Sequence, residues 1–300
     1  MTITELNLHY GIPEKITFIS GEGSLTNAVL QNQHGTAVIS LYGAQVLSYI
    51  PKGEKDLLWM SEKTAFEKGK AIRGGIPLCF PWFGPHATDT TKPQHGFARL
   101  SEWNVKSTTV SAEDTISIIL QLSNTAATEA LWPFAFNAEI KLTINTKLEL
   151  TLTCSNTDNK PFDYTNALHT YFNISDIATI NIEGLEGATY FPAGAENGII
   201  QKEKLVTFSQ EENRRYLGHD NNCIITDKGM NRIIYADKKG SNTTVVWNPG
   251  AEIAKTIGDM NDNGYKTFVC VEPANAFTNI IKLSPGESFS ISTIIYSKQA

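Results

Sequence analysis

The sequence has no pair of cysteines spaced as C-x-x-C. Its four cysteines lie far apart along the chain, at Cys79, Cys154, Cys223 and Cys270. This spacing excludes the usual sequence signatures of a zinc knuckle and of a redox dithiol. Cys154 and Cys270 fall inside alternating apolar runs, so we expect both to be small core residues.

A histidine pattern typical of a metal site is also absent. No two of the six histidines lie at i and i+4 in a segment that could be helical, and no C-x-x-C motif accompanies them. We therefore expect no metal ion in this protein.

Long apolar runs are missing as well. No run approaches the roughly 18 residues that a membrane-spanning helix needs. The first residues lack the basic region and the apolar region that together make a signal peptide. We therefore expect a cytoplasmic protein that does not associate with a membrane.

Positive charge is scarce, and arginine especially so. The 25 lysines and arginines are outnumbered by 31 acidic residues, which gives a formal net charge of −6. This balance argues against a nucleic-acid partner, which needs a basic face. It allows a small anionic ligand, because a few well-placed cations suffice to bind one. The five arginines are Arg73, Arg99, Arg214, Arg215 and Arg232.

Helical periodicity over ten or more residues is nearly absent, whereas strand-like alternation is common. In the segments 136–144 and 148–154, apolar and polar residues alternate, and turn-forming residues separate the two runs. This pattern predicts a β-hairpin with one buried face. We expect one short helix within 56–68. Further strands, rich in β-branched residues, are expected at 116–122, 243–247, 267–271 and 289–296.

Recurring strands with turn signals between them predict an all-β sandwich. The hydrophobic fraction of 41% and the charged fraction of 19% are ordinary for a globular protein with a sizeable core. The chain shows no internal repeat and no low-complexity linker. We therefore predict a single domain over residues 1–300.

Two segments dense in glycine, proline or aromatic residues interrupt the strand pattern. The first, RGGIPLCFPWFGPH at 73–86, cannot form regular strand and predicts a shaped loop. Its aromatic side chains could stack on the apolar face of a sugar ring, or they could simply plug the fold. The second, ALHTYFN at 167–173, contains His169, which is either a core residue or a catalytic one.

Two further segments carry polar groups that could be functional. QHGFAR at 94–99 contains His95, for which the same two interpretations are open. The stretch 247–272 ends in an apolar strand that Glu272 closes, directly before Pro273. A carboxylate at such a strand end either caps a neighbouring backbone or projects into a cleft.

Together, these segments resemble the glucose-6-phosphate 1-epimerases, the hexose-phosphate branch of the aldose 1-epimerase (galactose mutarotase-like) superfamily. RGGIPLCFPWFGPH, QHGFARLSEW, ALHTYFNISDI and VVWNPG…DMNDNGYKTFVCVE follow the family's order along nearly the whole chain. The resemblance implies a galactose mutarotase-like β-supersandwich that uses no metal and no cofactor. It also implies an isomerase that interconverts the α and β anomers of D-glucose 6-phosphate.

The resemblance further implies a catalytic pair. His169 matches the family's catalytic histidine, Glu272 matches its catalytic glutamate, and His95 matches a second active-site histidine of the superfamily. Exchange of anomers breaks the bond between C1 and the ring oxygen, which requires one base and one acid. We expect Glu272 to be the base and His169 the acid, because the ordinary pKa of histidine lies near neutrality.

The substrate-binding positions are implied in the same way. Arg73, Gln94 and Arg99 match such positions, and the two arginines are associated with the phosphate, which a guanidinium binds bidentately. The chain departs from the family in one segment. Where family members often have aspartate in D-R-x-Y, this chain has Asn213, which keeps an acceptor oxygen but loses the charge.

Three alternatives remain open at the level of sequence. A glycoside hydrolase or lyase would need two carboxylates, for which Asp259 and Glu272 could serve. A non-catalytic carbohydrate-binding sandwich would need only the aromatic residues. A mutarotase of unphosphorylated aldoses would use the same chemistry without a phosphate site. The partner that we expect is a small sugar phosphate, bound by a monomer.

Overall fold

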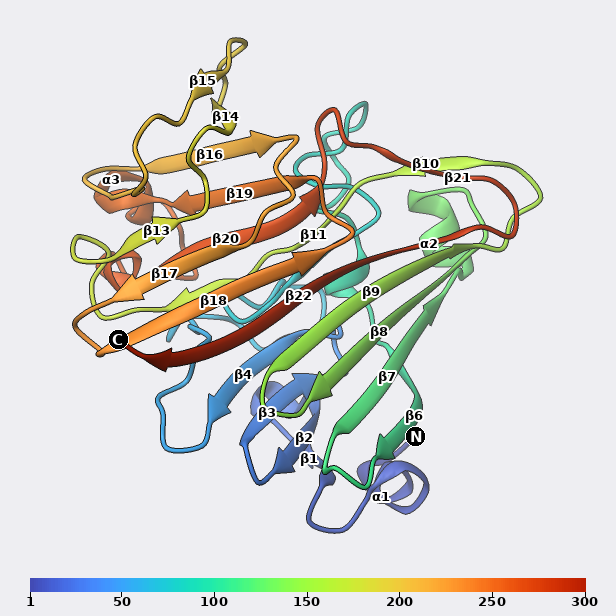
Figure 1. The fold of residues 1–300 in the computed structure, drawn as a ribbon. Helices are drawn as coiled ribbons and strands as arrows, with labels where there is room; N and C mark the ends of the chain where they lie inside the picture. The colour runs from blue at the N-terminus through green and yellow to red at the C-terminus, as the bar shows by residue number, and fades with distance from the viewer.

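The computed structural model describes all residues from 1 to 300 and consists mainly of antiparallel β-strands (Figure 1). It contains two eight-stranded sheets, here called the site sheet and the back sheet, a four-stranded N-terminal sheet and a small two-stranded sheet. One cluster of 57 buried residues takes side chains from the three larger sheets. The prediction of an all-β sandwich is confirmed.

The elements fall into five groups. The N-terminal sheet contains β1 (Ile16–Ser20), β2 (Thr26–Asn32), β3 (Gly35–Ser40) and β4 (Val46–Pro51). The site sheet contains β5 (Leu78–Cys79), β11 (Asn166–Leu168), β12 (Tyr171–Asn173), β14 (Thr189–Pro192), β15 (Ile199–Ile200), β16 (Glu212–Leu217), β19 (Thr243–Asn248) and β20 (Phe268–Asn275). The back sheet contains β6 (Asn104–Val110), β7 (Ile116–Ser123), β8 (Phe136–Ile144), β9 (Leu148–Asn156), β13 (Asn181–Glu183), β17 (Cys223–Asp227), β18 (Arg232–Lys239) and β22 (Ser288–Gln299). The small sheet pairs β10 (Phe162–Tyr164) with β21 (Ile281–Leu283). The helices are α1 (Ile3–Tyr10), α2 (Ala126–Leu131) and α3 (Gly250–Ala254), with 3₁₀ turns η1 (Glu22–Ser24), η2 (Ala98–Leu100) and η3 (Gly264–Thr267).

The predicted hairpin is confirmed as β8 and β9, which pair antiparallel from Ile144 and Leu148 at the turn. Along both strands, buried residues alternate with more exposed ones, so one face packs on the core and the other faces solvent. Cys154 and Cys270 are fully buried, as expected. The other predicted strands are also present, as β7, β19, β20 and β22.

The helix expected within 56–68 is wrong, because this segment is extended chain and turns. Oδ1 of Asp56 accepts hydrogen bonds from the backbone N–H of Tyr49 and of Leu58, each at 2.9 Å. The N–H of Trp59 donates to the carbonyl of Tyr171 at 3.0 Å. The apolar residues at 57–59 are thus buried by neighbouring chain rather than along a helix face. None of the helices that do form combines the length and the apolar character needed to cross a bilayer.

β20 also differs from its prediction, because it does not end at Glu272 but continues through Pro273 to Asn275. On one edge, β20 pairs with β12 at its beginning and with β11 at its end. The ladder on this edge is therefore interrupted between the two short strands. Pro273 lies in that interruption, where a residue without an N–H is tolerated.

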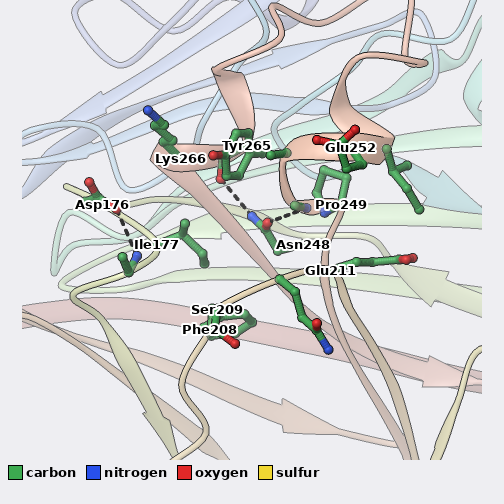
Figure 2. Close-up of a pocket in the computed structure, with 15 residues that line it drawn as sticks. Asp176, Ile177, Phe208, Ser209, Glu211, Asn248, Pro249, Glu252, Tyr265 and Lys266 are labelled. Atoms are coloured by element: carbon green, nitrogen blue, oxygen red, sulfur yellow. Dashed lines mark hydrogen bonds between the residues drawn. The ribbon is translucent and has the colours of Figure 1, made fainter.

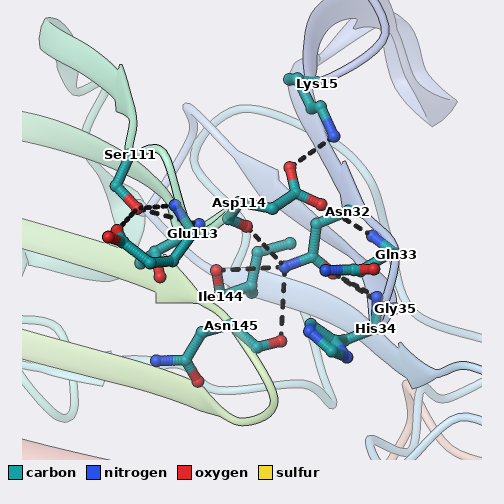
Figure 3. Close-up of polar contacts among 11 residues, drawn as sticks. Lys15, Asn32, Gln33, His34, Gly35, Ser111, Glu113, Asp114, Ile144 and Asn145 are labelled. Atoms are coloured by element: carbon teal, nitrogen blue, oxygen red, sulfur yellow. Dashed lines mark hydrogen bonds and ion pairs between the residues drawn. The ribbon is translucent and has the colours of Figure 1, made fainter.

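A polar network ties the N-terminal sheet to the back sheet (Figure 3). Nδ2 of Asn32 lies within hydrogen-bonding distance of the carbonyls of Asp114, Ile144 and Asn145, at 3.2–3.3 Å. Its Oδ1 accepts from two backbone N–H groups of the turn that follows β2, at 2.8 and 3.0 Å. The Asp114 carboxylate bonds Lys15 as well. One amide side chain therefore joins three turns from separate parts of the chain.

We expect Asn32→Ala to lower the free energy of unfolding by about 1–3 kcal/mol, the usual cost of leaving hydrogen-bonding groups without partners. Urea denaturation would measure the change. Gln33→Ala is the matched control, because the Gln33 side chain is exposed and makes no hydrogen bond, while its backbone N–H, bonded to Asp114, remains. Equal losses in the two variants would contradict a specific role for the Asn32 amide.

Candidate active site

The candidate catalytic pair forms where the site sheet is interrupted. Ala167 of β11 pairs with Ala274, and Tyr171 of β12 pairs with Cys270, in one continuous register. This register sets His169 directly opposite Glu272. The N–H of His169 donates to the Pro77 carbonyl at 3.0 Å instead of joining a ladder with β20. Nε2 of His169 and Oε1 of Glu272 lie 3.4 Å apart.

Both members of the pair are buried: His169 is 9% exposed and Glu272 is 1% exposed. Burial raises the pKa of Glu272 well above its usual range. Burial, with a smaller contribution from His95, lowers the pKa of His169 well below its usual value. Burial thus disfavours the charged form of each group. The pair is therefore suited to hold one proton between Oε1 and Nε2. Nδ1 of His169 and Oε2 of Glu272 make no hydrogen bond.

The neighbouring positions extend this arrangement across the sheet. Arg215 pairs with Val245, and Val245 with Glu272, so one row runs from β16 through β19 and β20 to His169. Because side chains alternate along strands, the positions two residues away face the same side. They form a second row, which consists of Asn213, Trp247, Cys270 and Tyr171.

His95 lies beside the pair, with its ring 5.8 Å from that of His169. The backbone N–H of Gly84 donates to Nδ1 of His95 at 3.1 Å, and the Cys79 sulfur lies 3.3 Å from the same atom. Because Nδ1 accepts, the ring proton is on Nε2. Burial lowers the pKa of His95 to about 3. His95 can therefore serve as a neutral hydrogen-bond donor.

This lowered pKa predicts acid destabilisation. His95 stays neutral in the folded chain, whereas in the unfolded chain it binds a proton below about pH 6.5. Its contribution to stability is therefore complete above that pH and is lost as the pH falls toward 3. For His95→Gln, we expect the free energy of unfolding to depend less steeply on pH between 6 and 4, by up to about 1.4 kcal/mol per pH unit. Urea denaturation across this range tests it, and an unchanged slope would contradict a neutral His95.

Arg73 is held in place by two groups. Its Nε donates to Oδ1 of Asp259 at 2.5 Å, and its Nη1 donates to the Tyr171 hydroxyl at 3.3 Å. The Tyr171 ring stacks on His169, with ring centres 4.9 Å apart and planes 14° apart. Asp259 therefore neutralises Arg73, and it does not line the pocket that contains Glu272. This arrangement speaks against Asp259 as the second carboxylate of a hydrolase.

Arg99 is placed differently, because no carboxylate forms an ion pair with it. Its Nη2 donates to the backbone carbonyl of Gln94 at 2.7 Å, and its Nε is buried without a partner. A buried N–H group without a partner is costly unless a ligand satisfies it. Arg99 is thus a cation of the pocket that no carboxylate neutralises.

All seven site residues expected from the sequence line one pocket of about 480 Å³. The loop 73–86 contributes Phe83 to it, whereas Trp82 is buried in the core and donates to the Pro93 carbonyl at 2.9 Å. Trp82 therefore plugs the fold, whereas Phe83 is placed where it could contact a ligand. The seven residues are Arg73, Gln94, His95, Arg99, His169, Asn213 and Glu272.

Arg215 also lines this pocket, although it is not among the site residues expected from the sequence. The alternation along β16 is a signal that could have found it, since Arg215 follows Asn213 by two residues. Arg214 faces the other way and binds both carboxylate oxygens of Glu212, at 2.7 and 2.8 Å.

One group of neighbouring residues could be considered for a metal. One potential ligand atom each from His169, Cys270 and Glu272 lies within 4.8 Å of the others. Burial raises the pKa of the Cys270 thiol well above its usual value, which disfavours the thiolate that zinc binds. The three residues are therefore a poor zinc site.

A larger pocket, of about 690 Å³, lies beside α3 and shares no residue with the first (Figure 2). The amide of Asn248 forms one wall, where it donates to the Tyr265 carbonyl and accepts from the Gly250 N–H. Asn248 and Trp247 are consecutive residues of β19 and therefore face opposite sides. The larger pocket contains no histidine. Its acidic groups, Glu211 and Glu252 among them, are largely exposed. The smaller pocket is therefore the stronger candidate.

The chain is similar to known proteins along most of its length. The family model described as aldose 1-epimerase matches residues 27–296. A protein of Escherichia coli named "Putative glucose-6-phosphate 1-epimerase" is 37% identical over 248 residues, which cover 83% of this chain and 82% of that protein. A protein of Cenchrus ciliaris with the same name is 36% identical, over 84% of this chain and 78% of its own length.

Solved structures show the same relationship. The chain superposes on the crystal structure of a "putative mutarotase" from Salmonella typhimurium with a TM-score of 0.89 and 31% sequence identity. The match covers 97% of this chain and 96% of that one. A galactose mutarotase related enzyme from Lactobacillus acidophilus, at 17% identity and a TM-score of 0.71, shares the fold. The galactose mutarotase-like β-supersandwich is therefore confirmed. The chain belongs to the aldose 1-epimerase family and is an epimerase, an enzyme of the isomerase class.

Proposed function

We propose that this enzyme interconverts the α and β anomers of an aldohexose 6-phosphate, with glucose 6-phosphate as the reference substrate. One observation carries the proposal: the buried pair of His169 and Glu272, 3.4 Å apart, lies in a pocket that Arg73 and Arg99 also line. The pair supplies the proton transfers, and the arginines supply the affinity for phosphate.

The reaction needs two proton transfers around C1. Glu272 takes the proton of the anomeric hydroxyl, the C1–O5 bond breaks with its electrons going to O5, and His169 gives a proton to O5. The open-chain aldehyde then rotates about C1–C2, and the reverse steps close the ring on the other face. The pair in its uncharged form holds the one proton that is needed. Its transfer from Oε1 to Nε2 gives the carboxylate and imidazolium of these roles, at the cost that burial sets on both charges.

Burial also favours this chemistry. A pair removed from water interacts more strongly with charge that develops on O1 and O5 than it would in solution. Nε2–H of His95 provides a neutral donor in the same pocket, suited to hold the ring oxygen or a hydroxyl. The phosphate is assigned to Arg99 together with Arg73, which lines the same pocket, because charge-assisted hydrogen bonds to phosphate are the strong ones.

The experiment is NMR exchange spectroscopy on glucose 6-phosphate at anomeric equilibrium, with and without enzyme, beside the same measurement on free glucose. We expect exchange of the phosphate sugar to be accelerated strongly and that of free glucose much less. Equal acceleration would favour the aldose mutarotase. Binding of the sugar phosphate without any acceleration would favour a non-catalytic sandwich, and release of reducing ends from oligosaccharides would favour a hydrolase.

A further inference from the structure

The proposed function leaves one guanidinium group of the pocket without a role. Three guanidinium groups line it, those of Arg73, Arg99 and Arg215, against the single carboxylate of Glu272. Asp259 neutralises Arg73, but neither Arg99 nor Arg215 forms an ion pair. Burial alone lowers the pKa of Arg215, as expected for a cation with no acidic neighbour. Two of the three cations, Arg99 and Arg215, therefore have no carboxylate partner in the pocket.

These two cations lie on opposite sides of the catalytic pair. Arg215 stands in the row that contains Glu272, two strands away, which places the two backbones about 10 Å apart. Arg99 belongs to η2, whose first residue, Ala98, donates its N–H to the Phe80 carbonyl, directly after β5. β5 and β16 lie on opposite sides of β20 in the site sheet. A single phosphate at Arg99 would therefore leave Arg215 unused.

The Arg215 side chain is fixed in its position. Its Nε donates to the Phe191 carbonyl at 3.2 Å, and its Nη2 donates to the Pro192 carbonyl at 2.7 Å. Its guanidinium carbon lies 4.7 Å from the centre of the Phe277 ring. The remaining nitrogen, Nη1, makes no hydrogen bond. A guanidinium held in this way loses little side-chain entropy when it binds an anion.

We propose that Arg215 is a second anion-binding point, and that the preferred substrate is an aldose 6-phosphate with a further anionic group. This inference rests on the proposed function. The anomeric hydroxyl must be free to react, and O6 carries the phosphate. The second group is therefore a substituent on C2, C3 or C4. Asn213 lies next to Arg215 on the same face of β16. Its amide can bond a sugar hydroxyl on C2, C3 or C4.

The test compares four substrates by NMR exchange: glucose 6-phosphate and its 2,6-, 3,6- and 4,6-bisphosphates, each with a free anomeric hydroxyl. For at least one bisphosphate, we expect kcat/KM about ten- to a hundred-fold above that of glucose 6-phosphate, the factor that one charge-assisted hydrogen bond gives. Arg215→Ala should remove this preference, and Arg215→Lys should keep part of it. Arg214→Ala is the matched control, because Arg214 is next on the strand and faces away from the pocket.

Three outcomes would overturn the inference while exchange of glucose 6-phosphate continues. One is that no bisphosphate is preferred by the unmodified enzyme. Another is that the preference survives in Arg215→Ala. The third is an equal loss of kcat/KM for glucose 6-phosphate and for the bisphosphate in Arg215→Ala, which would assign Arg215 to the single phosphate. Absence of exchange with all four substrates would instead overturn the proposed function itself. Circular dichroism of each variant verifies that it is folded.

Discussion

His169→Ala and Glu272→Gln are each expected to abolish nearly all anomer exchange while the chain stays folded. Each removes one of the two groups that move protons at C1 and O5, and such a group typically contributes about 10²–10⁴-fold to the rate. The fold should survive, because the contact between the two side chains is the only polar side-chain contact that the substitutions would alter. NMR exchange of glucose 6-phosphate measures the loss.

The two residues act as a unit, so the double variant should be little slower than either single variant. Glu211→Gln is a suitable control, because this exposed carboxylate lines the larger pocket and not the candidate site. Its exchange rate should equal that of the unmodified enzyme. A single variant of the pair that kept more than about a tenth of the rate would be too active for the assigned roles.

The second large effect is expected on phosphate recognition. Arg73→Ala or Arg99→Ala should raise KM for glucose 6-phosphate by about ten- to a hundred-fold, since each removes a charge-assisted hydrogen bond worth roughly 1.5–3 kcal/mol. For Arg73→Ala, we expect the larger increase, because the substitution also leaves the Asp259 carboxylate without its cation. Lysine at either position should recover part of the loss, because an ammonium keeps the charge but not the bidentate fork.

Steady-state exchange kinetics with glucose 6-phosphate and with free glucose would test this prediction. The effect on free glucose should be much smaller, because that sugar has no group for the arginines to bind. Arg214→Ala again serves as the control for loss of a positive charge. If both alanine variants bound the phosphate sugar normally, the phosphate site would lie elsewhere, and Arg215 would be the first group to test.

The parts of the fold that were predictable are those in which burial of one face imposes a period of two. The hairpin of β8 and β9 follows the alternation of its apolar residues almost residue for residue. The segment 56–68 was not predictable in this way, because its apolar residues are covered by β12 and its neighbours. The capping box of α1, in which Thr2 and Glu5 bond each other's backbone, is a local signal that went unused.

The site shows a similar division. The motifs identified the residues to consider, and the structure brings His169 and Glu272 together although about a hundred residues separate them in sequence. Their contact depends on the pairing of β11 and β12 with β20, which local propensity does not encode. For Arg215, the alternation along β16 predicts the same face as Asn213, and the register between β16 and β19 then places that face at the pocket.

The continuous register across the interruption at His169 also limits how the length of this segment can vary. Loss or gain of one residue between Leu168 and Tyr171 would shift β12 by one position against β20. Because neighbouring side chains point to opposite faces, Phe172 would then turn toward the pocket and Tyr171 toward the core. The strand pairing thus excludes from this segment of the candidate site the insertions and deletions that surface loops commonly tolerate.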